Sequence, residues 1–403
     1  MEENLMKIAI IGQGYVGLTL AMFASAKNEV IGFDLNVNLV KSLEMGKSHI
    51  EGITNDLLSD RLKSQNFSIT ANPKDLDGSQ VIVIAVPTPL DENRNPDLSF
   101  IERACQIIAE NVTNSALIIN ESTSYPGTVR NIIKSKIESL SKTKFLYAVS
   151  PERVDPGRSD WDQSNTPRIY AGLTKDASDL TSSFYSTFCN NLVEVATPEI
   201  AEAAKLFENT FRQVNIALVN ELAIICNALN IPVREVINAA ATKPYGFMKF
   251  NPSAGVGGHC IPVDPSYLAE IAAEHGIQAR FIELANSINL EMGSYIVNRV
   301  KLDHDGTLKG KNIQLIGVAY KPNVSDVRET PATQIFNELK KEGANVSYYD
   351  PLVPTWHTLA SSEIGAEISI VITLHDGIDI DQLKSKCRYI FDTTGKISDV
   401  TQL

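Results

Sequence analysis

Near its start the chain reads KIAIIGQGYVG over residues 7–17. A mostly apolar run of five residues leads into Gly12-Gln13-Gly14-Tyr15-Val16-Gly17, which has the spacing G-x-G-x-x-G and opens an alanine-containing helical segment. A second apolar run, at residues 29–33, ends at Asp34. This order of strand, glycine turn, helix, strand and acidic residue is typical of the first βαβ unit of a dinucleotide-binding Rossmann domain.

Each part of this pattern has a physical role at a dinucleotide. Gly12 permits the tight turn, Gly14 lets the backbone approach a pyrophosphate, and Gly17 lets the helix pack closely. The helix N-terminus supplies N–H donors and a positive dipole for the phosphates. Asp34 would accept hydrogen bonds from the adenosine ribose and repel a 2′-phosphate, and no arginine occurs at residues 35–37, so NAD is favoured over NADP.

The composition is that of a folded globular chain. Its 403 residues exceed the usual size of one domain, so two or three domains are expected. Forty-eight acidic against 36 basic residues give a net charge of −12, which repels nucleic acid and anionic membranes. No apolar run approaches the roughly 18 residues that span a bilayer, and the start lacks the basic residues of a signal peptide, so a cytoplasmic location is expected.

The cysteines differ in their surroundings. They are five in number, without a C-x-x-C pair, so neither a disulfide framework nor a metal site is expected. Three lie in apolar contexts and are expected to be buried and inert: Cys105, Cys189 and Cys226. Residues 250–264 read FNPSAGVGGHCIPVD, a glycine-rich loop that contains Cys260 and ends at Asp264. Such a loop is expected to expose backbone N–H groups to an anionic ligand and to leave the thiol accessible.

Further apolar runs extend the predicted sheet. Residues 81–86 and 116–119 are short and separated by a helical segment at 100–111, so we expect parallel strands of one doubly wound sheet. The loops that follow them contain Pro87-Thr88-Pro89 and Glu121-Ser122-Thr123. These loops are expected to border the cofactor crevice at the carboxyl ends of the strands.

One long helix is expected from about Pro198 to Asn230, where neither glycine nor proline follows Pro198 and apolar residues recur in steps of three and four. It would be about 48 Å long, which is suited to connecting domains and forming part of a subunit interface. Lys205 and Asn209 share one face of it. Beyond a linker at 303–311, strands and a helix predict a smaller βαβ domain without the glycine pattern. The expected domains are residues 1–197, 198–300 and 301–403.

The chain resembles the UDP-glucose/GDP-mannose dehydrogenase family, whose members oxidise C6 of a nucleotide sugar to a carboxylate with two NAD. The motifs that carry the resemblance lie along almost the whole chain: the glycine turn at 12–17, Glu121-Ser122-Thr123, Ser150-Pro151-Glu152-Arg153, the segment AAKLFENT at 203–210, Gly257-Gly258-His259-Cys260, Tyr320-Lys321-Pro322 and DVRETP at 326–331. The resemblance implies an NAD domain, a central helical region and a C-terminal UDP-binding domain in a dimer.

The resemblance also implies roles for individual residues. Cys260 would trap the aldehyde, and Lys205 and Asn209 would face the developing oxyanion. A thioester would then be hydrolysed by water positioned by one of Glu152, Thr123 or Asp264. Residues implied at the cofactor are Gly12, Gly14, Tyr15, Val16, Gly17, Asp34, Pro87, Thr88, Thr123 and Arg328. Residues implied at the substrate are Glu152, Arg153, Lys205, Asn209, Phe250, Gly255, Gly257 and Lys321, while surface ion pairing is an alternative for Lys321 and Arg328.

Two segments are similar to the branch of the family that acts on UDP-N-acetylhexosamines, the N-acetylmannosamine or N-acetylglucosamine derivative. Ile261-Pro262-Val263 precedes Asp264 where the UDP-glucose branch has a lysine, and residues 151–157 read PERVDPG where that branch has an aromatic residue after the glutamate. UDP-glucose is the alternative substrate.

The family resemblance is incomplete near the end of the chain. Many relatives carry an arginine in the segment that reads Asp392-Thr393-Thr394-Gly395-Lys396 here, and this chain lacks it. The phosphate contact that this arginine would make is therefore not expected, unless Lys396 supplies it as a point charge. Products of such enzymes usually feed surface polysaccharides.

Two other classes share only part of this pattern. A dehydrogenase of hydroxy acids would need the Rossmann half but no glycine-rich loop that presents a cysteine. A non-enzymatic NAD sensor would leave Lys205, Cys260 and Asp264 without a role. The sequence therefore favours the nucleotide-sugar dehydrogenase.

Overall fold

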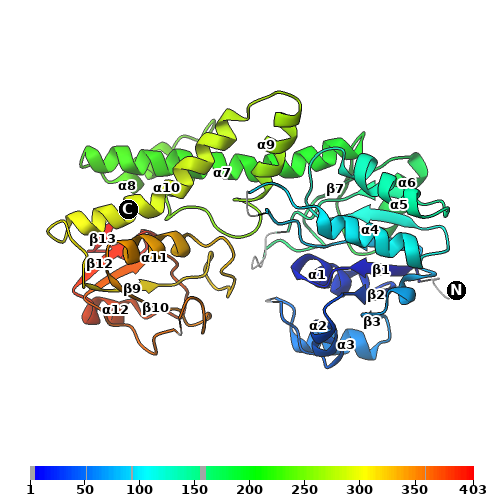
Figure 1. Ribbon diagram of the computed structural model, residues 1–403, viewed down its shortest axis with the longest axis horizontal. Coiled ribbons are helices and arrows are strands. Elements are labelled where there is room, and N and C mark those ends of the chain that lie inside the picture. Colours follow the sequence, from blue (N-terminus) through cyan, green and yellow to red (C-terminus); the bar gives the residue numbers. More distant parts are fainter. Residues whose placement is uncertain (1–4, 51, 92–93, 155–159, 359) are drawn as a thin grey trace. The chain divides into compact units, whose positions relative to one another are not determined.

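The structure is a computed structural model that describes residues 5–50, 52–91, 94–154, 160–358 and 360–403 (Figure 1). The chain divides into two compact units, the first ending at Phe207 and the second beginning at Glu208. The boundary falls inside the long helix α7 (Pro198–Ala228). Each unit contains its own mostly or wholly parallel sheet, as the sequence predicts.

The sheet of the first unit has the strand order β3-β2-β1-β4-β5-β6-β7-β8. Its neighbours pair in parallel except β6 and β7, which are antiparallel. The strands are β1 (Lys7–Ile11), β2 (Glu29–Phe33), β3 (Phe67–Thr70), β4 (Val81–Ile84), β5 (Leu117–Asn120), β6 (Leu146–Val149), β7 (Arg168–Gly172) and β8 (Leu192–Glu194). The predicted strand at 81–86 ends two residues early, where the backbone leaves the sheet for the loop of Thr88.

Helices cover both faces of this sheet, because successive strand residues point to opposite sides. Ile8 and Ile10 of β1 pack into one apolar core, whereas Ala9 and Ile11 pack into another. The helices are α1 (Tyr15–Ala24), α2 (Val37–Glu44), α3 (Asn55–Lys63), the 3-10 turn η1 (Pro73–Leu76), α4 (Ser99–Asn111), the π-helical η2 (Thr128–Lys134), α5 (Ser135–Leu140) and α6 (Lys175–Tyr185). The predicted doubly wound fold is confirmed.

The long predicted helix is also confirmed, and α7 ends at Ala228, two residues before the predicted end. The chain reverses there, with Asn230 in the left-handed region at φ 56° and Pro232 directly before the next helix. Proline lacks the N–H that would continue a helical hydrogen-bond ladder. The connecting helices of the second unit are α8 (Val233–Ala240), α9 (Asp264–Glu274) and α10 (Arg280–Leu302).

The second unit contains a five-stranded parallel sheet with the order β10-β9-β11-β12-β13. Its elements are β9 (Asn312–Ile316), α11 (Pro331–Lys341), β10 (Asn345–Tyr349), β11 (Ile368–Val371), α12 (Ile380–Lys386), β12 (Tyr389–Asp392) and β13 (Thr401–Gln402). Thr330 caps α11, with its side chain accepting a hydrogen bond from the Ala332 amide and Pro331 in the first turn. This is the smaller βαβ sheet that the sequence predicts.

Asp350 at the end of β10 closes the first turn of this second sheet. Its carboxylate accepts hydrogen bonds from the Val318 and Ala319 amides at 2.7 and 3.2 Å, and from the amides of Leu352 and Val353. His375 Nε2 lies 3.1 Å from the same carboxylate. Hydrogen bonds within the chain therefore occupy both oxygens of Asp350.

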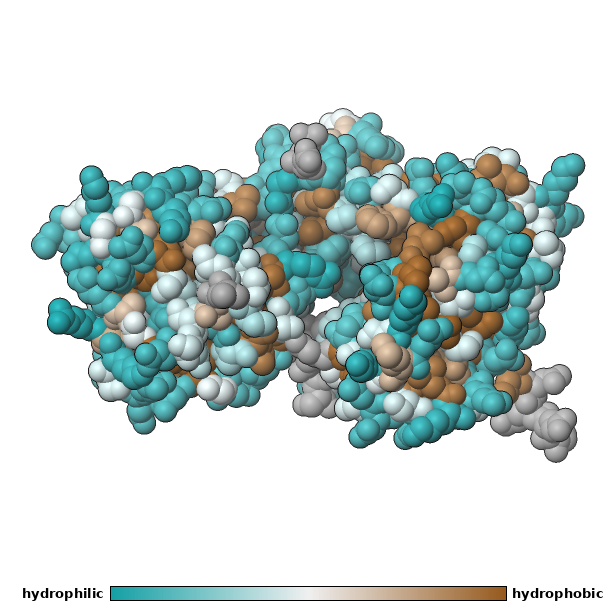
Figure 2. All heavy atoms as spheres, turned by 60° about the horizontal axis from the view of Figure 1, so that its bottom comes forward, coloured by the Kyte–Doolittle hydropathy of each residue, from teal (hydrophilic) through white to brown (hydrophobic). Residues whose placement is uncertain are grey.

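Charged residues are distributed widely over the surface. On the face drawn in Figure 2, hydrophilic residues predominate and hydrophobic residues form smaller areas between them. Within the described residues, none of the helices combines the length and the apolar character that crossing a bilayer requires.

Candidate active site

The glycine turn between β1 and α1 is shaped by close packing at two of its three glycines. Gly12 has φ +92°, and a Cβ there would lie 2.5 Å from the Ala85 carbonyl oxygen. A Cβ at Gly17 would lie 1.8 Å from the Gly12 carbonyl oxygen, so the helix could not approach the turn. A Cβ at Gly14 would meet no protein atom within 4 Å. Packing within the chain thus accounts for Gly12 and Gly17, whereas Gly14 borders open space.

Asp34 follows β2 and lies against this turn. Its carboxylate accepts hydrogen bonds from the amides of Gln13 and Asn36, both at 2.8 Å. The side chain therefore has a fixed orientation beside the N-terminus of α1, where Tyr15 and Val16 form the first turn. This is the place at which a Rossmann domain binds the pyrophosphate and the adenosine ribose, so the residues present fit NAD.

The loops after β4 and β5 are tied together at the carboxyl edge of the sheet. Ser122 Oγ donates to the Val86 carbonyl oxygen at 2.8 Å, and the Asn120 side chain donates to the Ser122 carbonyl oxygen at 3.0 Å. The candidate residues Pro87 and Thr88 directly follow Val86 in the chain, and Thr123 directly follows Ser122. Thr88 is buried and Thr123 is partly exposed.

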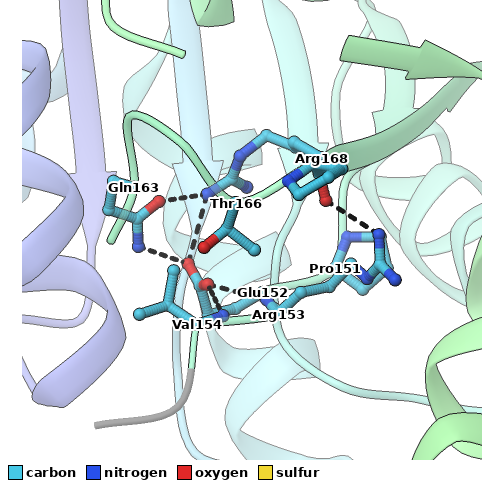
Figure 3. Close-up of a pocket in the computed structure, with 8 residues that line it drawn as sticks. Pro151, Glu152, Arg153, Val154, Gln163, Thr166 and Arg168 are labelled. Atoms are coloured by element: carbon cyan, nitrogen blue, oxygen red, sulfur yellow. Dashed lines mark hydrogen bonds and ion pairs between the residues drawn. The ribbon is translucent and has the colours of Figure 1, made fainter. Parts of the chain in front are cut away.

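Glu152 follows β6 and is surrounded by donors (Figure 3). The amides of Arg153 and Val154 donate to Oε1 at 2.7 and 2.5 Å, while Gln163 and Arg168 donate to Oε2 at 2.6 and 3.2 Å. Burial opposes ionisation of Glu152, but the charge of Arg168 and the hydrogen bonds of Gln163 and Val154 together hold its pKa below the ordinary value. Glu152 is therefore an ionised, fixed carboxylate.

Arg153 extends away from this carboxylate. Its Nη1 donates to the carbonyl oxygen of Pro167 at 2.8 Å, which Figure 3 shows as a separate contact. Asp155, Pro156 and Gly157, which belong to the segment that separates the two substrate branches, lie outside the described residues.

Arg168 also binds a second buried carboxylate, a contact that sequence reasoning missed. Its Nη1 lies 2.8 Å from Glu121 Oε1, which also accepts a hydrogen bond from the Tyr185 hydroxyl. Burial raises the pKa of Glu121 to about 7 despite the neighbouring guanidinium. One feature of the sequence could have revealed this contact: Arg168 is a charged residue at the start of the apolar segment RIYAG, and a buried charge requires a partner of opposite charge.

Lys205 lies on α7 within the electrostatic reach of this group. It is partly buried, and its charge contributes to lowering the pKa of Glu152. The first unit thus brings together the glycine turn and Asp34 in one place, and Glu152 with Lys205 in another.

The second unit brings Asn209 and Asp264 together. Asn209 Nδ2 donates to Asp264 Oδ2 at 2.5 Å, and the two residues are only 5% and 1% exposed. The Asp264 amide donates to the Cys260 carbonyl oxygen at 2.9 Å, in the turn that begins α9. Cys260 is exposed, while Cys105, Cys189 and Cys226 are buried, which confirms the expected difference between the cysteines.

The glycine-rich loop packs tightly against residues 320–331. A Cβ at Gly257 or Gly258 would lie 2.8 or 2.7 Å from the Tyr320 side chain, and one at Gly255 would lie 2.9 Å from the Asn289 carbonyl oxygen. The Gly258 amide donates to the Arg328 carbonyl oxygen at 3.0 Å. The expectation that the loop exposes its amides to a ligand is therefore wrong for Gly258, whose N–H is used inside the fold.

The remaining candidates of the second unit are closer to its surface. Phe250 forms an edge contact with Phe211, with ring centroids 5.9 Å apart. Arg328 forms an ion pair with Asp326 at 2.6 Å, the arrangement that the sequence left open as an alternative. Lys321 is partly exposed and Lys396 is exposed.

Comparison with known proteins places the chain among the NAD-dependent oxidoreductases that act on nucleotide sugars. Three models of one family match it in order: the NAD binding domain over residues 6–189, the central domain over 199–291 and the UDP binding domain over 314–398. The chain belongs to the UDP-glucose/GDP-mannose dehydrogenase family, as the sequence motifs predict.

Individual relatives cover most of the chain. The UDP-N-acetyl-D-glucosamine 6-dehydrogenase of Pseudomonas aeruginosa is 35% identical, covering 86% of this chain and 83% of that protein. A solved UDP-D-ManNAc dehydrogenase from Pyrococcus horikoshii has a TM-score of 0.89 at 32% identity, covering 98% and 97% of the two chains. A UDP-glucose dehydrogenase from Pyrobaculum islandicum has a TM-score of 0.88 at 23% identity, covering 97% and 94%, and shows the fold alone.

Proposed function

We propose that this enzyme oxidises C6 of a UDP-N-acetylhexosamine, the N-acetylmannosamine or N-acetylglucosamine derivative, to the uronate. The observation that carries the proposal is an exposed Cys260 one helical turn before the buried Asn209–Asp264 pair, in a chain whose relatives at 35% identity act on these sugars. UDP-glucose remains the alternative, because the family to which the chain belongs is that of the UDP-glucose and GDP-mannose dehydrogenases.

NAD, when bound, accepts a hydride in each of the two oxidation steps. The residues that would hold it are the glycine turn with Tyr15 and Val16, Asp34, and the loops of Thr88 and Thr123. The open space at Gly14 supports this placement, since the chain's own packing does not require a glycine there. We also assign Pro87 and Arg328 to the cofactor, the latter through its exposed guanidinium.

Cys260 is the proposed nucleophile. Its thiolate would add to the C6 aldehyde to form a thiohemiacetal, which loses a hydride to become a thioester. Covalent attachment would keep the aldehyde from escaping. Lys205 and Asn209 would stabilise the oxyanion, a contribution of about 2.7–4 kcal/mol for one such donor in a dry site.

The proton of the alcohol and the water that hydrolyses the thioester need a second group. Asp264 is the preferred candidate because its amide donates to the carbonyl oxygen of Cys260, four residues earlier, and its carboxylate is bound by Asn209. Thr123 could position the water. Glu152 already receives four hydrogen bonds within the described structure, about the number that a carboxylate can accept, which favours an orienting role for Glu152 and Arg153 at the substrate.

We propose three functional domains, with residues 1–197 for the cofactor, 198–300 for catalysis and dimer formation, and 301–403 for UDP. Lys321 would contact the phosphates, and Phe250, Gly255 and Gly257 would shape the sugar pocket. The enzyme is proposed to work in the cytoplasm, and its product to feed a surface polysaccharide.

A homodimer is supported by exposed apolar residues on α7 and α10. Leu218 and Ile225 of α7 are 59% and 50% exposed, and Phe281 and Leu284 of α10 are 78% and 59% exposed. A second copy of the chain could bury them. Sedimentation velocity of the unmodified protein and of Leu218→Glu should show a dimer that the charged variant weakens, and a monomeric unmodified protein would contradict this.

Steady-state assays with a panel of UDP-sugars test the substrate. The amide of an N-acetyl group needs space and polar partners that a hydroxyl would leave unmatched. We expect kcat/KM for a UDP-N-acetylhexosamine to exceed that for UDP-glucose by at least about tenfold, which corresponds to roughly 1.4 kcal/mol of transition-state binding. Equal or faster turnover of UDP-glucose would overturn the choice of sugar but not the assignment of Cys260.

A further inference from the structure

The side chain of Arg234 lies against the loop that follows β12. It starts from the first turn of α8, and its Nη2 donates to the Thr393 carbonyl oxygen at 2.9 Å. The same nitrogen reaches the Pro252 carbonyl oxygen at 3.4 Å. A Cβ on Gly395 would lie 1.7 Å from Nε of Arg234, so the guanidinium can occupy this position only because residue 395 has no side chain.

This guanidinium forms no ion pair within the described residues, although the charge of the buried Asp392 acts on it. Its Nε is buried without an acceptor, and no carboxylate of the described chain forms an ion pair with it. Asp392 uses its oxygens to accept hydrogen bonds from Thr394 and from the Ile397 amide instead of binding Arg234 directly. Burial lowers the pKa of Arg234, but a guanidinium stays protonated at neutral pH.

This guanidinium, which forms no ion pair within the described chain, is at a position suited to an anionic ligand. Ligands of parallel α/β sheets bind outside the carboxyl ends of the strands, and residues 393–395 form such an end in the sheet of the second unit. The match to the UDP binding domain of the family includes this loop. The cation also lies in the first turn of a helix, where the helix dipole disfavours positive charge and favours an anion.

We propose that Arg234 binds the diphosphate of the UDP moiety and supplies the guanidinium that residues 392–396 lack. The proposal rests on the proposed function, because it assumes a UDP-linked substrate. A planar guanidinium presents parallel N–H groups to phosphate oxygens, which the point charge of Lys396 cannot do. Neutralisation by the diphosphate would also relieve the cost of holding an unpaired charge in a half-buried place.

Calorimetric titration of the full chain with UDP, UMP and uridine, without NAD, tests the assignment. Arg234→Gln should weaken UDP binding by at least about tenfold, the effect of roughly 1.4 kcal/mol, and should leave uridine binding unchanged. Arg299→Gln is the matched control. Arg299 belongs to the same unit, donates to the Gln402 carbonyl oxygen at 3.2 Å and stacks over Phe391, so its loss should not change UDP affinity.

The outcomes separate the possibilities. Equal UDP affinity of Arg234→Gln and the unmodified protein overturns the assignment, and a loss confined to Lys396→Gln transfers the role to Lys396. Should Arg234→Gln fail to fold, Arg234→Lys replaces it, with weaker UDP binding expected and unchanged binding as the contradicting result. Failure of the unmodified protein to bind UDP at all would contradict the proposed function itself.

Discussion

Arg168 lies 3.2 Å from Glu152 in the first unit, and their side chains are only 5% and 12% exposed. Each charge would be costly in this place without the other. The same guanidinium binds Glu121, so one cation holds the two segments that carry the Glu121-Ser122-Thr123 and Pro151-Glu152-Arg153 motifs. The pair thereby fixes the edge of the sheet at which β5 and β6 end and β7 begins.

Arg168→Met should destabilise the chain by about 3–5 kcal/mol at neutral pH, because it leaves buried carboxylates without their cation. The native Glu152 has a lowered pKa, so its contribution exists above the ordinary value and is lost as the pH falls through the lowered one. Without the guanidinium, burial should raise the pKa of both glutamates, as it already does for Glu121, so the loss caused by the substitution should shrink as the pH falls from 7.5 to 5 and they take up protons. Urea unfolding at several pH values measures this.

The exposed Arg130–Glu199 ion pair provides the control for this experiment, with Arg130 half exposed. Arg130→Met should cost less than about 1 kcal/mol, since water screens such a pair. A loss for Arg168→Met that is equally large at pH 5 and pH 7.5 would contradict the role assigned to the buried charges.

Glu202 should make stability fall as the pH rises through the neutral range. Burial raises its pKa to about 8, although the Gly127 and Val129 amides donate to it. A raised pKa means that the native state holds a proton which the unfolded state has already released, so stability is lost as the pH increases through that value. The slope should reach about 1.4 kcal/mol per pH unit at most.

Glu202→Gln removes the titrating group, and the free energy of unfolding should then vary less between pH 6 and pH 9. Glu199→Gln is suited as its control, because the pKa of Glu199 is lowered and its titration lies outside this range. An unchanged slope in Glu202→Gln would show that another group is responsible.

Cys260→Ser should abolish steady turnover, since an ester of serine is hydrolysed more slowly than a thioester. The unmodified enzyme should form two NADH for each sugar, which absorbance measures. It should release no free aldehyde, which an aldehyde-trapping reagent would detect. Cys105→Ala should remain active, because burial raises the pKa of the Cys105 thiol to about 12 and it takes no part in the chemistry. One NADH per product would contradict covalent catalysis.

Asp34→Asn should weaken the binding of NAD, because the carboxylate that accepts hydrogen bonds from the ribose is lost. It should also reduce the preference for NAD over NADP, because the repulsion of a 2′-phosphate disappears. The ratio of kcat/KM for the two cofactors measures the effect. Asp350→Asn, the corresponding change in the second sheet, should lower stability without changing this ratio. A preference of the unmodified enzyme for NADP would refute the assignment of Asp34.

The sequence predicted what depends on local pattern. The glycine spacing at 12–17 and the apolar runs located β1, β2 and the doubly wound sheet, because strand burial leaves a continuous signal. The exposed Cys260 followed from a loop too rich in glycine to form a helix or a strand. Boundaries differed by one or two residues, as at β4 and at the end of α7, where tertiary packing decides the last turn.

The sequence did not predict the contacts that only the folded chain creates. Arg168 meets Glu121 and Glu152 because three strands lie side by side, and no spacing in the chain encodes that distance. The place of Arg234 beside Gly395 likewise depends on how α8 packs on the second sheet. The glycine-rich loop was expected to expose its amides, and the hydrogen bond of the Gly258 amide was not predicted because its acceptor, the Arg328 carbonyl oxygen, is far away in sequence.

The closed turn at Asp350 explains how two similar sheets in one chain avoid competing for the same cofactor. Asp350 ends its strand as Asp34 does, but backbone amides and His375 already occupy its carboxylate. Within the described residues Asp34 accepts two amide hydrogen bonds, one on each oxygen, and so keeps acceptor capacity for a ribose, whereas four amides and His375 leave Asp350 little or none. We therefore expect the second sheet not to bind a dinucleotide, and converting it would require first releasing Asp350 and then rebuilding the turn around glycines.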